Sequence, residues 1–166
     1  MSRGMMLNKF EWPKAEEEVD EIIIRNVRKH GCHIVGIPTD EQGPGYAFSI
    51  GLFVNYGHAE LIVFGLERDD LAKVINSVRD RVIAGRKFAA GDVCDDLLVE
   101  SRIGFVEVPL RLYDDYLGTA IWFYQKSPRP FPCLQMVWSD RDGRFPWNAG
   151  YDERLRGYQP LLKDPS

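Results

Sequence analysis

The alternation of large and small side chains is clearest between residues 43 and 66 of this chain. Over residues 46–52 every second side chain is large and those between are small, a period of two that is typical of a β-strand. Residues 61–64 are apolar throughout, which is typical of a strand covered on both faces. Gly57 and the two residues before it supply turn chemistry between these runs. The pattern therefore predicts a buried strand pair at the centre of a sheet.

Helical spacing of apolar residues predicts three helices. Residues 14–30 carry acids first and bases last, an order that complements the helix dipole, and Gly31 is suited to end this helix. The other two helices are predicted at residues 67–85 and 113–125. We expect the helix at 67–85 to lie on the small-residue face of residues 46–52, because small side chains allow close approach.

Three further strands are predicted at residues 32–37, 103–112 and 133–138. Pro109 favours an edge position or a strand end, because proline cannot donate a ladder hydrogen bond. Residues 91–100 follow neither the strand period nor the helix period clearly. The tail from Phe145 onward carries aromatic residues with little periodicity, so we expect irregular structure there.

The predicted order is helix, three strands, helix, strand, helix, strand. It lacks the regular alternation of strand and helix that builds a parallel sheet. We therefore expect an α+β fold, a mainly antiparallel sheet or small barrel flanked by about three helices. No internal repeat or linker divides the chain. Residues 14–162 are expected to form one domain, preceded by a flexible lead-in at 1–13 and followed by a tail at 163–166.

The composition is that of an ordinary soluble globular protein, with 166 residues of which 45% are hydrophobic and 28% charged. The net charge of −4 argues against a nucleic-acid binder, which needs a basic field. Cys32, Cys94 and Cys133 form no CxxC pair, which is typical of reduced thiols in a cytoplasm. With no apolar signal segment and no run near about 18 apolar residues, a cytoplasmic protein without a membrane span is expected.

His58 and Glu60 are the most suggestive polar pair, because they open a buried strand directly after the glycine turn. Two residues apart on a strand, they would lie on one face about 7 Å apart, close enough to contact one ligand or water. One interpretation is an acid–base or ligand-anchoring pair. The other is that one of the two side chains caps loop amides.

Several recurrent site types are not supported by the sequence. His30 and His33 have no third ligand nearby for a metal ion. A calcium loop beginning at Asp140 would need glycine at Phe145 and glutamate at Tyr151. No Gly-x-Ser-x-Gly elbow and no glycine-rich phosphate loop occurs. We therefore predict no metal site and assign no catalytic residue.

A set of motifs occurs in one order along the chain. They are HG at 30–31, GPGYAFSIGL at 43–52, HAEL at 58–61, DYLG at 115–118, WFY at 122–124, QMVWSD at 135–140 and GRFPW at 143–147. Over residues 30–162 the chain resembles a bacterial family, domain of unknown function 4262. Ala59 is a departure, because the family pattern has proline between the histidine and the glutamate. The resemblance implies domain limits and residues of interest, but no reaction.

Two hypotheses from different classes follow, and whether the protein is an enzyme stays open. The first is a binding domain without a cofactor that recognises a small molecule or a protein partner. Its candidate ligand-binding residues are His58, Glu60, Tyr46, Ser49, Arg86, Lys87 and Trp147.

The second hypothesis is a flavin-dependent oxidoreductase, motivated by similarity in length and strand content to split-barrel flavin reductases. Ser49, Arg86 and Lys87 would then contact the phosphate of FMN, and His58 the ring edge or the substrate. Such reductases are dimers with the cofactor at the interface, so this alternative implies a homodimer. A further alternative is an immunity-like inhibitor that binds a protein partner tightly.

Overall fold

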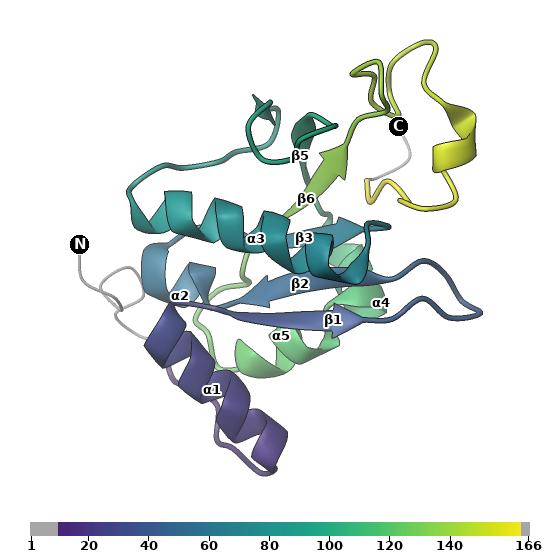
Figure 1. Ribbon diagram of the computed structural model, residues 1–166. Helices are drawn as coiled ribbons and strands as arrows, with labels where there is room; N and C mark the ends of the chain where they lie inside the picture. Colours follow the sequence, from purple (N-terminus) through teal and green to yellow (C-terminus); the bar gives the residue numbers. More distant parts are fainter. Residues whose placement is uncertain (1–9, 164–166) are drawn as a thin grey trace.

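A computed structural model of the chain describes residues 10–163 (Figure 1). Its α-helices are α1 (Glu18–His30), α2 (Leu52–Tyr56), α3 (Arg68–Ile83), α4 (Tyr113–Tyr116) and α5 (Gly118–Phe123). The strands are β1 (His33–Ile37), β2 (Tyr46–Ile50), β3 (Glu60–Phe64), β4 (Val93–Cys94), β5 (Ile103–Glu107) and β6 (Cys133–Trp138). Two 3₁₀ turns complete the described elements, η1 (Leu110–Leu112) and η2 (Glu153–Leu155).

The six strands form one open sheet in the order β1-β2-β3-β6-β5-β4. Four of the strand pairings are antiparallel, and β3 pairs with β6 in parallel. The predicted α+β fold is therefore confirmed in its mainly antiparallel form. The sheet does not close into the barrel that was the other form considered, because β1 and β4 are its two edges.

Apolar side chains on both faces of the sheet form two hydrophobic clusters. On one face α1 and α5 cover β2 and β3, and this cluster includes Ile23, Phe48, Ile62 and Phe123. On the other face α3 covers the sheet, and this cluster includes Ala47, Val63, Val74 and Ile75. The expected packing position of the helix at 67–85 is confirmed, because the α3 side chains pack with Ala47 on the small-residue face of β2.

Three predicted elements differ from those observed. The turn expected after residue 52 is the short helix α2, which Gly57 ends with a left-handed backbone at φ 66°. The helix expected at 113–125 is divided into α4 and α5 at Leu117, whose backbone is not helical. The strand expected at 103–112 ends at Glu107, and η1 begins just after Pro109.

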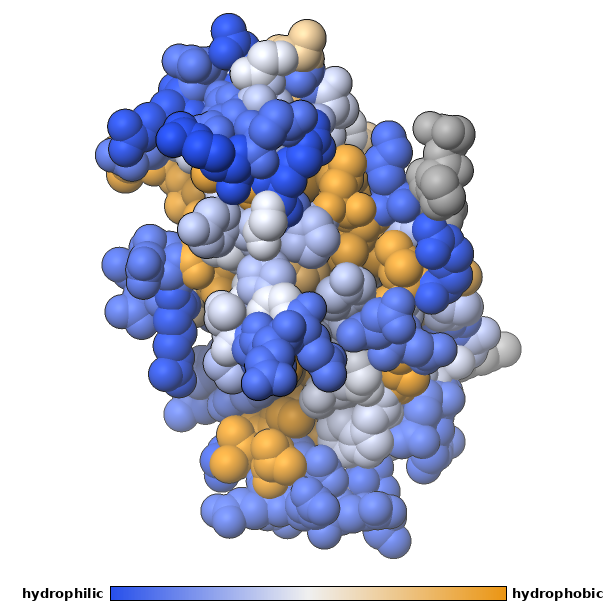
Figure 2. Space-filling model, turned by 90° about the vertical axis from the view of Figure 1, so that its right-hand side faces the viewer, coloured by the Kyte–Doolittle hydropathy of each residue, from blue (hydrophilic) through white to orange (hydrophobic). Residues whose placement is uncertain are grey.

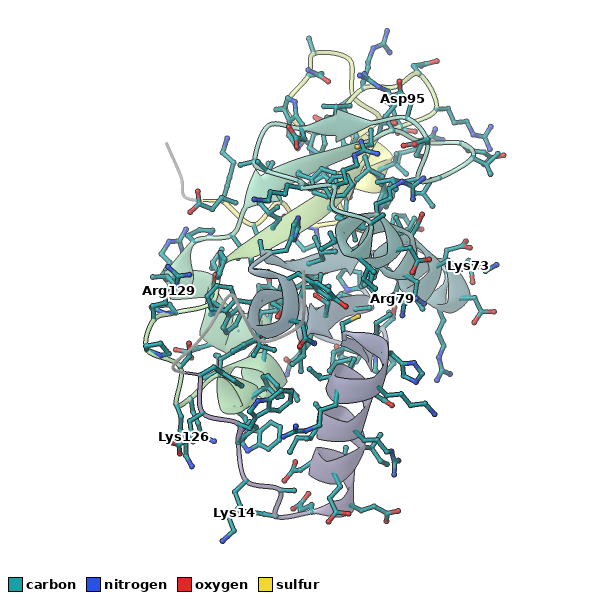
Figure 3. The ribbon with its side chains drawn as sticks, turned by 90° about the vertical axis from the view of Figure 1, so that its left-hand side faces the viewer. Lys14, Lys73, Arg79, Asp95, Lys126 and Arg129 are labelled. Atoms are coloured by element: carbon teal, nitrogen blue, oxygen red, sulfur yellow. The ribbon has the colours of Figure 1, made fainter. Side chains whose placement is uncertain are left out.

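The last residues of the predicted lead-in lie against the body. The ring of Phe10 stacks on Phe123 of α5 with 5.6 Å between centroids, and Trp12 contacts the same ring edge-on. Lys126, which follows α5 and is labelled in Figure 3, forms a 3.0 Å ion pair with Glu11. The rest of the lead-in, residues 1–9, and residues 164–166 of the tail lie outside the described residues. No helix among residues 10–163 combines the length and apolar character needed to cross a membrane.

The C-terminal segment, residues 156–163, is held to the sheet by two buried glutamines. The side chain of Gln135 donates to the carbonyl of Pro160 and accepts from the amide of Leu162, each at 2.7 Å. The side chain of Gln159 donates to the carbonyl of Trp138 at 2.6 Å and accepts from its amide at 3.2 Å. These side-chain amides pair with backbone groups, so an irregular segment is fixed without forming a strand.

We predict that Gly65→Ala destabilises the protein much more than Gly85→Ala. Both glycines have positive φ, 78° and 104°, so alanine costs about 1–2 kcal/mol of backbone strain at each. A methyl group at Gly65 would also collide with the carbonyl oxygen of Tyr158, whereas Gly85 has no neighbouring atom within 4 Å. Urea denaturation should show a loss of about 3 kcal/mol or more for Gly65→Ala. Equal losses would contradict the packing of the C-terminal segment.

Candidate functional site

The side chain of Glu60 is fully buried at the start of β3. Its carboxylate accepts the backbone amides of Gly51 at 2.9 Å, Leu52 at 3.2 Å and Phe53 at 3.2 Å. These are the amides at the beginning of α2, which have no partner within the helix itself. Glu60 therefore caps loop amides, which is the second of the two interpretations given for this residue.

Two hydroxyl groups complete the environment of the Glu60 carboxylate. Ser49 of β2 donates to it at 2.7 Å and accepts the amide of Leu61 at 2.9 Å. The hydroxyl of Tyr124, just after α5, donates to Glu60 and accepts the amide of Val54 at 3.3 Å. Burial raises the pKa of Glu60, and the hydrogen bonds from Tyr124, Ser49 and the loop amides oppose that rise. We call Glu60, Ser49, Tyr124 and the α2 amides the carboxylate cap.

We predict that Glu60→Gln lowers the free energy of unfolding by about 3 kcal/mol. The substitution keeps the size of the side chain but places an NH₂ group among donors, so buried amides lose their acceptor. Chemical denaturation of the variant measures this loss. Glu107→Gln is the matched control, because Glu107 is exposed at the end of β5 and should change stability by less than about 0.5 kcal/mol. Similar losses for the two variants would exclude the carboxylate cap.

His58 is buried in the loop before β3, and both ring nitrogens are bonded. Its Nδ1 lies 2.8 Å from the carbonyl of Ala59, and its Nε2 accepts the amide of Phe88 at 3.0 Å. A carbonyl only accepts and an amide only donates, so Nδ1 carries the proton and the ring is neutral. The ring lies edge-on to Phe88, which belongs to the cluster on the α3 face.

The expectation that His58 and Glu60 lie two residues apart on one strand is wrong. The strand begins at Glu60, so His58 lies in the loop and the period of two does not include it. The two side chains bond to different partners: His58 to the amide of Phe88 and the carbonyl of Ala59, and Glu60 to Ser49, Tyr124 and the α2 amides.

Burial lowers the pKa of His58, an effect opposed by the hydrogen bond to Ala59 and reinforced by the charge of Lys87. Between the ordinary pKa of about 6.5 and this lowered value, the unfolded chain binds more protons than the folded chain. Stability is therefore expected to fall as the pH drops below about 6.5. Burial also lowers the pKa of His33, which adds to the same trend.

We predict that His58→Gln reduces this pH dependence of stability. Unfolding free energies measured from pH 7.5 down to about 5 should fall less steeply in the variant, by up to about 1.4 kcal/mol per pH unit. The comparison variant is His30→Gln, which removes a histidine that is exposed at the end of α1 instead of a buried one. An identical slope for His58→Gln and the parent protein would count against a buried neutral imidazole.

The residues grouped for a flavin phosphate do not come together. Ser49 is fully buried inside the carboxylate cap. Arg86 and Lys87 are exposed in the loop after α3. The guanidinium of Arg86 lies 4.6 Å over the ring of Phe88 and donates to the Sγ of Cys94 at 3.2 Å. The hydroxyl and the two cations therefore face different surroundings.

The chain's cysteines are free and buried. Burial raises the pKa of the Cys32 thiol to about 12, and it also raises the pKa of Cys94 and Cys133. All three are therefore thiols rather than reactive thiolates at neutral pH. Among residues 10–163, no group of three or more histidine, cysteine, aspartate or glutamate side chains is placed to hold a metal ion.

Trp147 is 44% exposed and stacks on Phe145, with ring centroids 4.8 Å apart and planes 12° from parallel. The indole lies over Gly104 of β5, where any larger residue would meet it. Trp147 is thus a surface aromatic at the β5 side of the sheet, whereas Tyr46 lies at the β1–β2 loop. The structure does not bring these two candidates together.

Tyr46, one of the sequence-predicted candidates, lines a cavity. It is half-buried at the start of β2, where its ring packs on Phe64 and its hydroxyl donates to the carbonyl of Tyr116 at 3.0 Å. The cavity beside it has a volume of about 480 Å³ and is also lined by Asp115 and Arg156.

A second cavity, of about 570 Å³, adjoins the first. It is bordered by Glu67 and Arg68 at the start of α3 and by Tyr158 of the C-terminal segment. The two cavities share the loop residues Asp40, Gln42, Gly43 and Pro44 and also Gly157. We call them together the loop groove.

The loop that divides the loop groove is internally ordered. Asp40 and Gly43 exchange backbone hydrogen bonds of 3.1 and 3.3 Å, which closes a two-residue turn. The carboxylate of Asp40 accepts the amide of Gln42 at 2.8 Å, and the hydroxyl of Thr39 accepts the amide of Gly45 at 2.8 Å. The wall of the groove is therefore formed before any ligand arrives.

Sequence reasoning missed Asp115 and Arg156 as groove residues. The groove combines the β1–β2 loop, α4 and the C-terminal segment, which are far apart in the sequence. The only local signal was the Gly-Pro-Gly run at 43–45, and it indicated a turn rather than a site.

A family model described as a domain of unknown function, DUF4262, matches residues 26–152. The match includes all seven candidate residues and the β1–β2 loop, and it ends before residues 156–163. Comparisons with curated proteins and with solved structures gave no match.

Proposed function

Because the chain belongs to the DUF4262 family, whose description names no activity, we propose its function from its own geometry. The protein is a binding domain that holds a small polar molecule in the loop groove. The observation that carries this proposal is the pair of cavities, about 480 and 570 Å³, built on one ordered loop. Each is within the range of about 300–1,000 Å³ that is typical of small-molecule pockets.

The lining of the loop groove offers both polar and aromatic contacts. Asp115 and Arg156 supply charges of opposite sign, and Tyr46 and Tyr116 supply ring surface at the first cavity. A few polar groups on an aromatic floor fix the orientation of a small ligand. Figure 2 shows the side of the molecule on which the β1–β2 loop projects, where hydrophilic side chains predominate and apolar patches lie between them.

Binding is favoured over reaction by where the chemically active side chains lie. His58, Glu60 and Ser49 have their polar atoms bonded inside the body, and none of them lines either cavity of the loop groove. The separate surroundings of Ser49, Arg86 and Lys87 give the flavin alternative no phosphate site. The single carboxylate and the two hydroxyls of the carboxylate cap support the fold instead.

We predict that Gly43→Phe and Gly157→Phe each abolish ligand binding while the fold is kept. Both glycines line both cavities, and a Cβ atom added at either position meets no atom within 4 Å. We therefore expect the backbone to accept the new residue and its phenyl ring to block the groove. The measurement is a thermal-shift screen of a library of polar metabolites, with native mass spectrometry of each hit.

Ala90→Phe is the control for this screen, because Ala90 is exposed and lies outside both linings. Its hits should equal those of the parent protein. A hit that binds the parent and both glycine variants with equal affinity would place the ligand elsewhere. A screen without any hit for the parent protein would count against a small-molecule site.

A further inference from the structure

One edge of the sheet is the strand β1, which pairs only with β2. Bonded and non-bonded residue pairs alternate along an antiparallel ladder. The amide of Gly65 donates to the carbonyl of Gly45 at 2.9 Å, and Tyr46 lies opposite Phe64 at the next step. The odd-numbered residues of β2 therefore bond toward β3, and its even-numbered residues bond toward β1.

This alternation identifies the backbone groups at the free edge. The β1 residues opposite the even-numbered positions of β2 are His33, Val35 and Ile37. Ile34 and Gly36 therefore direct their amides and carbonyls away from the sheet. Among the described residues, no other hydrogen bond to these four groups is found.

The residues of β1 do not include the charged side chains or proline that commonly prevent edge strands of two molecules from pairing. The strand His-Ile-Val-Gly-Ile carries no lysine, no acidic residue and no proline. Gly36 is exposed, and a Cβ atom added there would meet no atom within 4 Å, so the sheet face beside this residue is open. Beside Val35 lies an apolar groove of about 370 Å³, lined also by Val19 of α1 and Trp122 of α5.

We propose that a second copy of this chain pairs with the first through β1, by a two-fold axis at Val35. In that register Ile34 of the first copy lies opposite Gly36 of the second copy, and Gly36 of the first copy lies opposite Ile34 of the second copy. Each of these two pairs exchanges two backbone hydrogen bonds, so all four outward groups at each edge are satisfied. Val35 packs against its own equivalent on the axis, over the apolar groove.

The charges at the two ends of β1 favour a second copy of this chain as the partner. Lys29 and His30, at the basic end of α1, lie just before the strand, and Asp40 and Glu41, at the acidic loop tip, lie just after it. Figure 1 shows the end of α1 and the β1–β2 loop at opposite ends of β1. The two-fold axis places the basic end of one copy beside the acidic tip of the other, twice. The edge is therefore complementary to itself.

The test is the oligomeric state of the full chain. Sedimentation of the parent protein over a concentration series should show a monomer–dimer equilibrium. Gly36→Pro removes the outward amide and leaves the bonds from β1 to β2 in place, so the dissociation constant should rise about tenfold or more. Gly36→Ala keeps that amide and is the matched control, expected to dimerise as the parent does.

Hydrogen exchange gives a second readout that needs no variant. The Ile34 and Gly36 amides should become protected as the protein concentration rises. The Val35 amide, which bonds to β2, should be protected at every concentration. Protection of Ile34 and Gly36 that is independent of concentration, or absent at the highest concentration, would overturn the proposal.

A charge exchange tests the complementarity of the two ends. Lys29→Glu alone should weaken the dimer, and adding Glu41→Lys in the same chain should restore it. A monomeric parent protein at all concentrations, or a dimer as strong in Gly36→Pro as in Gly36→Ala, overturns the proposal. Neither result would alter the loop groove, whose own test is ligand binding.

Discussion

The carboxylate cap of Glu60 is the interaction on which the structure depends most. One buried side chain at the start of β3 receives Ser49 from β2, Tyr124 from the end of α5 and three amides that begin α2. Removing a carboxylate from water is costly, and a site with this many donors offsets part of that cost. The cap fixes the positions of four elements relative to one another, which apolar packing alone would leave less well defined.

The same cap decides which residues are left for function. Glu60, Ser49 and His58 would be attractive in a catalytic site, but their polar atoms are used within the fold. Our two proposals therefore place function at the margin of the sheet. The β1–β2 loop divides two cavities, and β1 itself ends the hydrogen-bond ladder with four backbone groups directed outward. Both proposals use this margin, one by a small molecule and the other by a second copy of the chain.

Much of the fold was predictable, because the signals were local. Residues 46–50 alternate between large and small, and residues 61–64 are apolar throughout, so side-chain period predicts the first strand and a short apolar run predicts the second. The helix α3 could be assigned from the helical spacing of its apolar residues. Its position against Ala47 could be predicted because small side chains on that face of β2 allow close approach. Two features had no local signal. The parallel pairing of β3 with β6 joins segments separated by 68 residues (65–132), and α2 is stabilised by a carboxylate that follows it in the chain.

By itself the sequence determined the α+β class, the positions of most strands and helices, and the family, since each depends on neighbouring residues or on their order. It also identified Glu60 as a residue of interest, but left open whether this residue binds a ligand or caps amides. Only the tertiary structure decided that question, because the donors to Glu60 include Tyr124, which is 64 residues away. The loop groove and the free edge of β1 were decided in the same way. A cavity or a free strand edge is formed only when segments that are distant in the sequence pack together.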